Sequence, residues 1–191
     1  MNHRGHPKKP IPRTQLPLER IAAGFLRESV EEAPDLARQL GSLNELGMRE
    51  LGGVLGRFDS RGRGELDARE RLLARRVLGR LHKPGVDSLA LTNKVLDYLD
   101  LDMSALIEED ELELCVEIIE RFCCAGGTGN RLTSRELEIL YAVLRHLDKD
   151  GNGQLDAMER QALRKGLGSP QSFMEEHRKS NPHIQRLLAQ Q

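Results

Sequence analysis

The sequence predicts an all-α protein of paired helix-loop-helix units, arranged as two duplicated halves. Apolar residues recur every three or four positions along most of the chain, and no segment alternates with period two as a half-buried strand would. Aromatic residues are only 3% of the chain and tryptophan is absent, so the core has to consist of aliphatic residues, which suit helices. A loop-like pattern also occurs twice, and this repeat predicts the two halves.

The first half is expected to follow a disordered basic tail. Residues 1–17 are rich in proline and cations and lack apolar periodicity, so they predict either a solubilising tail or a docking arm for an acidic partner. Apolar spacing and caps then predict four helices. The first two begin at Leu18 and Pro34, the third follows a capping box at Ser42, and the fourth carries an apolar stripe at 72–81 after a cap formed by Asp67 and Glu70.

The same signals predict the helices of the second half. Thr133 and Glu136 form another capping box, and two late prolines suit first helical positions. The expected helices cover 92–99, 109–122, 133–147, 156–167, 170–179 and 182–189. We therefore divide the chain into a tail at 1–17, an N-terminal unit at 18–85, a C-terminal unit at 86–168 and a helical tail at 169–191.

The duplication covers two loops and the helices before them. A shift of 89 positions superimposes a series of identical pairs, and so many matches in order indicate homologous units. The pairs include Leu43 and Leu132, Leu51 and Leu140, Val54 and Val143, Leu55 and Leu144, Asp59 and Asp148, Gly64 and Gly153, Leu66 and Leu155, Asp67 and Asp156, Ala68 and Ala157, and Glu70 and Glu159.

Residues 148–159, DKDGNGQLDAME, carry the chemistry of a metal site. They fit D-x-[DN]-x-[DN]-G-x5-E without exception. Calcium takes six to eight oxygen ligands, and alternating side chains can supply them as the loop wraps the ion. The predicted ligands are the side chains of Asp148, Asp150 and Asn152, the backbone carbonyl of Gln154, Asp156 directly or through water, and both oxygens of Glu159.

These twelve residues resemble the EF-hand family. The resemblance implies an all-helical fold, calcium as the bound ion, with magnesium at rest as an alternative, and loops paired at their eighth places. A metal-free interpretation of Asp156 and Glu159 is that they cap the following helix. That interpretation leaves Asp148, Asp150 and Asn152 unexplained.

Residues 59–70, DSRGRGELDARE, keep the same frame without the ligands. Arg61 and Arg63 replace the third- and fifth-place ligands, and a guanidinium has no lone pair to donate and stays protonated. We expect the two arginines to pair with the carboxylates at Asp59, Asp67 and Glu70, in an internal salt cluster that replaces the ion.

Two further predictions concern the other loops. Leu155 is expected to pair with Leu132, in the unliganded stretch 125–136, and Leu43 with Leu66. Residues 100–111 are a second candidate metal loop, with oxygen ligands at Asp100, Asp102, Ser104, Glu108 and Glu111; alternatively, Ser104 caps a helix whose first turn is acidic.

Several function classes lack support in the sequence. The net charge is −1, which does not suit a nucleic-acid binder, and no apolar run approaches a membrane span or a signal peptide. Six scattered histidines and the absence of GxSxG, HExxH or a P-loop predict no enzyme. Cys115, Cys123 and Cys124 lack CxxC spacing, so we expect reduced thiols in a cytoplasmic protein.

Two binding functions remain. In the first, calcium at 148–159 reorients the flanking helices and exposes an apolar surface to a protein partner, as in a sensor or adaptor. In the second, calcium stabilises or is buffered by a module that does not open. Only Met158 adjoins the loop, and phenylalanine is scarce, so the sequence does not separate the two.

Overall fold

The regular elements of the protein are helices, as the sequence predicts. The computed structural model describes residues 17–100, 116–120, 131–167, 179 and 182–189. Within these ranges there is no strand, and residues 116–120 are also helical. The elements are α1 (Leu18–Glu32), α2 (Pro34–Gly41), α3 (Glu45–Phe58), α4 (Ala68–Leu78), α5 (Val86–Asp97), α7 (Ser134–Leu147), α8 (Ala157–Leu167) and α10 (Pro182–Ala189).

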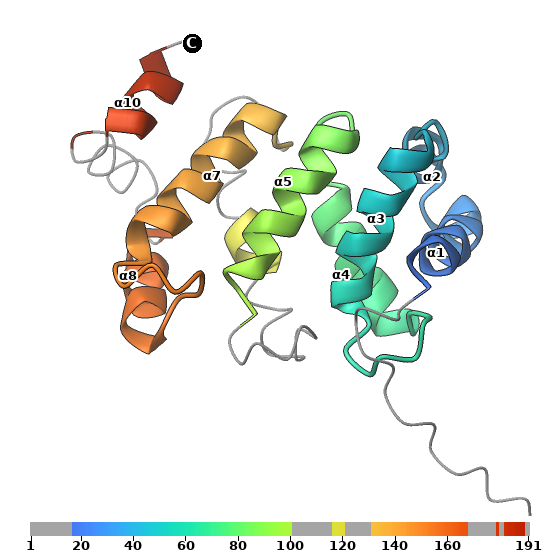
Figure 1. The fold of residues 1–191 in the computed structure, drawn as a ribbon. Helices are drawn as coiled ribbons and strands as arrows, with labels where there is room; N and C mark the ends of the chain where they lie inside the picture. Colours follow the sequence, from blue (N-terminus) through green and yellow to red (C-terminus); the bar gives the residue numbers. More distant parts are fainter. Residues whose placement is uncertain (1–16, 101–115, 121–130, 168–178, 180–181, 190–191) are drawn as a thin grey trace, which may run out of the picture.

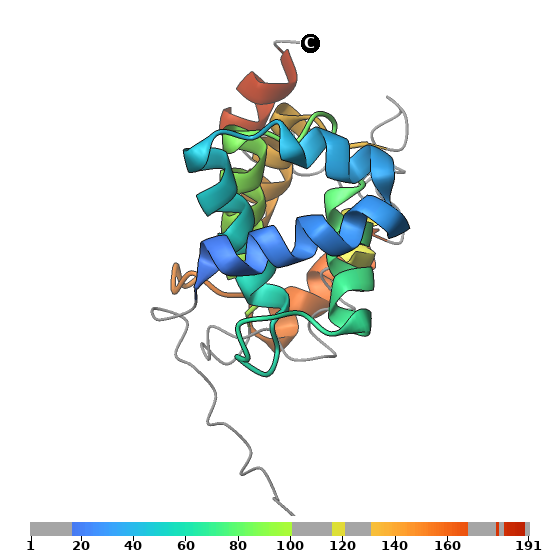
Figure 2. The same ribbon diagram turned by 90° about the vertical axis from the view of Figure 1, so that its right-hand side faces the viewer.

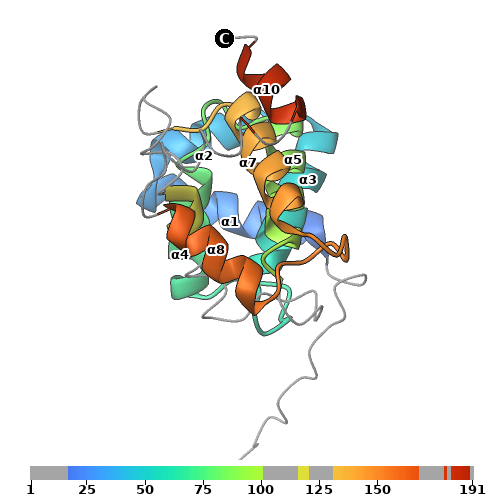
Figure 3. The same cartoon turned by 90° about the vertical axis from the view of Figure 1, so that its left-hand side faces the viewer.

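Helices α3, α5 and α7 stand side by side in a row (Figure 1). α5 packs against both of its neighbours, α1 packs against α3 and α2, and α7 also contacts α8 and α10. Figure 2 shows α1 and α2 covering one end of this row, and Figure 3 shows α7 with α8 and α10 at the other. The loops after α3 and after α7 therefore belong to separate helix-loop-helix units with α5 between them.

One apolar core runs through the row. Buried aliphatic and aromatic side chains from α1 to α8 form a single cluster, which includes Phe25, Phe58, Leu96, Leu140 and Leu163. Leu66 and Leu155, at the eighth places of the two loops, belong to the same cluster. Both loops are thus anchored to the core by one leucine, as their shared frame predicts. None of the described helices has the length and hydropathy needed to cross a membrane.

Two predicted helix starts are wrong. The N-cap of α3 is Asn44, whose side chain accepts from the Gly47 N–H at 2.9 Å, whereas Ser42 donates to the Gln39 carbonyl and closes α2. α5 begins at Val86 instead of Thr92, because Gly85 and Ser88 bond each other across the first turn. In both cases a short polar residue near the predicted cap forms the better local hydrogen bonds.

Close packing of α1 on α3 explains the glycine at position 52 of α3. A Cβ atom at Gly52 would lie 2.5 Å from the backbone oxygen of Leu18, closer than any tolerated contact. Glycine lowers intrinsic helix stability by about 1 kcal/mol relative to alanine. At this position the missing side chain allows α1 to lie directly against α3.

The predicted pairing of Leu132 with Leu155 is also wrong. Leu132 forms a parallel β-bridge with Leu81, in which its N–H donates to the Arg80 carbonyl at 2.5 Å and its carbonyl accepts from the His82 N–H at 2.7 Å. Both backbone groups of Leu132 are therefore engaged. This bridge joins the segments that lead into α5 and α7, and it is the only one among the described residues; none joins Leu43 to Leu66.

Other predictions fall wholly or partly outside the described residues. Of the candidate loop 100–111 only Asp100 is described, and it is buried. The three cysteines, most of the predicted helix 109–122 and nearly all of 170–179 lie outside as well. The final predicted helix, 182–189, is confirmed as α10.

Candidate metal centre

The loop between α7 and α8 brings three predicted ligands together. One carboxylate oxygen from each of Asp148, Asp150 and Glu159 lies within 4.8 Å of the other two. Asp148 ends α7 and Glu159 lies in the first turn of α8, so the group spans both helices. Asp148 and Glu159 are each only 9% exposed, whereas Asp150 is open to solvent.

Asp148 organises the loop backbone. Its two carboxylate oxygens accept from the N–H groups of Asn152 at 3.1 Å and Gly153 at 2.9 Å. The backbone can turn this sharply because Gly151 and Gly153 have φ values of +69° and +85°, a region that residues with a Cβ atom avoid.

The other end of the loop is closed by a capping box. Glu159 accepts from the N–H groups of Lys149 at 2.9 Å and Asp156 at 3.0 Å. Asp156 in turn accepts from the N–H groups of Met158 and Glu159, both at 2.8 Å. Asp156 therefore caps α8 and does not join the three-carboxylate group, whereas Glu159 belongs to both arrangements.

Two amide side chains complete the loop. Asn152 donates through Nδ2 to Asp150 at 2.9 Å and accepts through Oδ1 from the Gln154 N–H at 2.8 Å. Gln154 donates through Nε2 to the backbone carbonyl of Asp100 at 3.0 Å. Sequence reasoning predicted a role only for the Gln154 backbone and missed this contact with the segment that follows α5. A long-range side-chain contact of this kind leaves no local sequence signal.

Two tyrosines lie beside the centre and were also missed. Tyr98 follows α5 and Tyr141 lies on α7, with ring centroids 5.8 Å apart in an edge-to-face arrangement. Burial raises the pKa of the Tyr98 hydroxyl, and Tyr141 and the negative charge of Asp148 raise it further. These are the only tyrosines in the chain, which contains no tryptophan, so its ultraviolet emission originates beside this loop.

The three carboxylates have no cationic side chain to balance them. No ion pair with Asp148, Asp150 or Glu159 occurs in the described part of the chain. Two like charges about 4 Å apart near a protein surface repel by roughly 4 kcal/mol. Clustered carboxylate and amide oxygens are the ligand set that hard divalent cations prefer, so the group fits Ca²⁺ or Mg²⁺.

The loop after α3 has the same backbone arrangement around a different centre. Asp59 accepts from the N–H groups of Arg63 at 2.9 Å and Gly64 at 2.6 Å. Glu70 accepts from the N–H groups of Ser60 at 3.1 Å and Asp67 at 2.8 Å. These four bonds occupy the same places as their counterparts at 148–159.

A guanidinium provides the positive charge in this loop. Nη2 of Arg63 lies 3.2 Å from both Asp67 and Glu70, which confirms the predicted salt cluster for this arginine. Asp59 does not join it, because its oxygens face backbone N–H groups, and no ion pair of Arg61 occurs in the described structure. The N–H of Glu70 first, then the charges of Arg63 and Arg61, lower the pKa of Asp67.

Comparison with known proteins identified no relative of this chain. No protein-family model matches the chain, and comparisons with curated proteins and with solved structures found no match. The assignment of the centre therefore depends on the loop pattern, the carboxylate geometry and the contrast with the arginine-containing loop.

Proposed function

We propose that residues 148–159 bind one calcium ion and that the protein acts as a calcium-responsive adaptor or sensor. The observation that carries this proposal is the group of three carboxylates without a cationic partner, at the position where Arg63 supplies a cation in the homologous loop. Magnesium is the ion expected to compete at rest, because it prefers the same hard oxygen ligands.

The proposed ligands divide into two groups. Asp148, Asp150 and Glu159 supply the carboxylates that already converge. Asn152 and the Gln154 carbonyl follow Asp150 by two and four positions in the same loop, and Asp156 contributes directly or through water. Because Asp148 ends α7 and Glu159 lies in the first turn of α8, an ion held by both would fix the angle between these helices.

A response to calcium requires a surface that a partner protein can recognise. Met158, on the first turn of α8, is 78% exposed, and methionine is common in surfaces that bind partner helices. The basic segment at 1–17 and the C-terminal helix α10 are further candidate contact regions for an acidic or apolar partner in the cytoplasm. The partner is proposed to be a protein rather than a nucleic acid, because the net charge is only −1.

The alternative is a calcium-stabilised module that does not open. One observation favours it: Leu163 of α8, with Leu147 and Leu155 around the loop, belongs to the single core that runs through the protein. Moving α8 away would expose these side chains, at a cost of about 1.5–3 kcal/mol for each fully exposed leucine.

Calorimetric titration with calcium tests both proposals. We expect one site in the parent chain, with a dissociation constant on the order of 10⁻⁷–10⁻⁵ M, and its loss in Glu159→Gln. Glu138→Gln, an exposed position on α7 with the same charge change, is the control and should leave the site intact. Absence of heat at millimolar calcium, with unchanged tyrosine emission, would refute calcium binding.

An apolar dye separates the adaptor from the rigid module. The adaptor predicts dye binding that appears with calcium and is absent in Glu159→Gln. The module predicts the same calcium affinity and a higher melting temperature, without dye binding. Repeating the titration in millimolar magnesium measures the competition between the two ions.

A further inference from the structure

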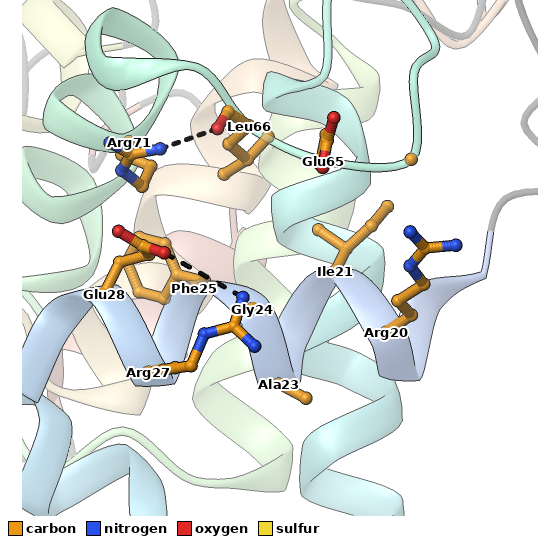
Figure 4. Close-up of a pocket in the computed structure, with 11 residues that line it drawn as sticks. Arg20, Ile21, Ala23, Gly24, Phe25, Arg27, Glu28, Glu65, Leu66 and Arg71 are labelled. Carbon is orange, nitrogen blue, oxygen red and sulfur yellow. Dashed lines mark hydrogen bonds and ion pairs between the residues drawn. The ribbon is translucent and has the colours of Figure 1, made fainter.

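A cavity of about 320 Å³ separates α1 from the arginine-containing loop. Figure 4 shows α1 along one side, with Ile21 and Phe25 facing the loop, and Leu66 and Arg71 on the opposite side. Ile21, Phe25 and Leu66 contribute apolar atoms to a lining that is otherwise largely polar. Its volume is at the lower end of the range for small-molecule sites.

Arg71 lies on this cavity with an incomplete set of hydrogen bonds. Its Nη1 donates to the backbone carbonyl of Leu66 at 2.8 Å, which fixes the guanidinium at the cavity wall. Its Nε is buried and has no acceptor. A buried donor without an acceptor destabilises a fold, and a guanidinium fork matches the two oxygens of a carboxylate.

The charges around the cavity favour an anion. Three arginines and two glutamates line it, and Arg27 lies 3.9 Å from Glu28. Neither Arg20 nor Arg71 pairs with a carboxylate in the described structure. Glu65 is exposed, so solvent screens its repulsion of an incoming anion.

The seventh-place residues of the two loops have different surroundings. In the loop at 148–159 the seventh-place residue, Gln154, contacts the carbonyl of Asp100. The seventh-place residue of the other loop, Glu65, borders the cavity instead. Arg63 holds that loop closed without a metal, so the cavity wall does not depend on calcium.

We propose that this cavity binds a small monocarboxylate with a branched apolar body. The carboxylate pairs with the Arg71 guanidinium, whose Nη1 stays on the Leu66 carbonyl, and the apolar body packs on the carbon atoms of Ile21, Phe25 and Leu66 that line the cavity. This site is independent of the calcium site proposed above, so each can fail without the other.

Chemical-shift titration of the full chain with 4-methylpentanoate tests the proposal. We expect saturable shifts of the Gly24, Phe25 and Leu66 amides, with a dissociation constant of about 1 mM, typical of so small a ligand. The same shifts should occur with calcium and with a chelator. The neutral analogue 4-methylpentan-1-ol controls for apolar contact and should bind at least about tenfold more weakly.

Three variants assign the binding to Arg71. Arg71→Met should weaken binding at least about tenfold, and Arg71→Lys should weaken it less, because the charge remains but the fork is lost. Glu28→Gln should strengthen binding about threefold, because it removes a neighbouring negative charge. Arg38→Met, on an exposed part of α2, is the control for loss of one arginine.

Either of two results would overturn the proposal. One is equal binding of the alcohol and the carboxylate. The other is unchanged binding in Arg71→Met, in a spectrum that shows the loop still folded. Loss of calcium binding in Glu159→Gln with carboxylate binding retained would separate the two sites.

Discussion

The loops at 59–70 and 148–159 bend the backbone in the same way around different centres. In each, the first-place aspartate accepts from the fifth and sixth N–H groups, and the twelfth-place glutamate accepts from the second and ninth. Glycines at the fourth and sixth places have positive φ in both loops. The same backbone contacts therefore hold the frame of both loops.

The centres differ at two positions. At the third and fifth places one loop has Arg61 and Arg63, and the other has Asp150 and Asn152. Arg63 supplies a cation from within the chain, whereas Asp150 adds a third carboxylate to a group that forms no ion pair with the described residues. One loop thus contains its own cation, and the other holds the carboxylate group for which we propose a calcium ion.

Exchanging the third- and fifth-place residues of the two loops should have the largest effect, which is on the number of calcium sites. Arg61→Asp with Arg63→Asn gives the first loop every residue of the calcium pattern, and calorimetry should then find two calcium sites per chain. The reverse exchange, Asp150→Arg with Asn152→Arg, should leave none. A new site with micromolar affinity corresponds to a binding free energy of roughly −8 kcal/mol at a 1 M standard state.

Conservative exchanges control for the disturbance of the loops. The chain with Arg61→Lys and Arg63→Lys should still have one calcium site, because its first loop gains no ligand. Asp150→Asn alone should also leave one site, with weaker calcium binding. A single site in the Arg61→Asp, Arg63→Asn chain would mean that the buried Asp59 cannot turn from the backbone toward an ion.

The twelfth-place glutamates should differ in their effect on metal-free stability. Glu70→Gln breaks a largely buried contact with Arg63 and should lower the free energy of unfolding by about 2 kcal/mol. Glu159→Gln loses similar backbone bonds but relieves repulsion with Asp148 and Asp150, so its cost should be near zero. Urea unfolding in the presence of a chelator measures the free energy of unfolding of both variants. Equal losses in the two variants would contradict the proposed difference between the two loops.

Replacing either sixth-place glycine by alanine should lower the free energy of unfolding by the same amount. Gly64→Ala and Gly153→Ala each place a Cβ atom on a backbone with φ of +77° and +85°. The added atom would lie 3.4 Å from Pro17 in the first case and near nothing in the second, so neither creates a serious clash. Each should cost about 1 kcal/mol of unfolding free energy in a chelator, from backbone strain alone. A difference above about 1 kcal/mol would show that the frames are not equivalent.

Local patterns in the sequence predicted most helices and the frame of both loops. Capping boxes at Asp67 and Thr133, and glycines before the eighth-place leucines, depend on contacts between residues close in the chain, so spacing alone reveals them. The Arg63 salt cluster was predictable for the same reason, since its partners are only four and seven residues away.

Contacts between distant segments were not predictable. The bridge of Leu81 with Leu132 and the contact of Gln154 with Asp100 depend on how the units pack, and one sequence carries no record of that. The predicted partner of Leu155 was wrong for this reason. The start of α5 was missed because Gly85 is an N-cap without a side chain, which weakens the sequence signal.

The smallest predicted effect concerns the titration of Asp67. Its pKa is lowered chiefly by the N–H of Glu70 and secondarily by Arg63, with Arg61 contributing least. A carboxylate with a lowered folded-state pKa stabilises the fold above its unfolded pKa, near 3.8, and this contribution is lost as the pH falls through the folded value.

Removing the arginines one at a time should raise the pKa of Asp67 in steps. The rise in Arg63→Met should exceed that in Arg61→Met, and in neither should the pKa reach 3.8, because the Glu70 N–H remains. Carbon NMR of the Asp67 carboxyl group measures this directly, with Arg49→Met as a distant control. The associated change in unfolding free energy should be about 0.5 kcal/mol or less, because the pair is partly exposed. A larger rise in Arg61→Met would instead place Arg61 at the centre of the loop and displace Arg63 as its internal cation.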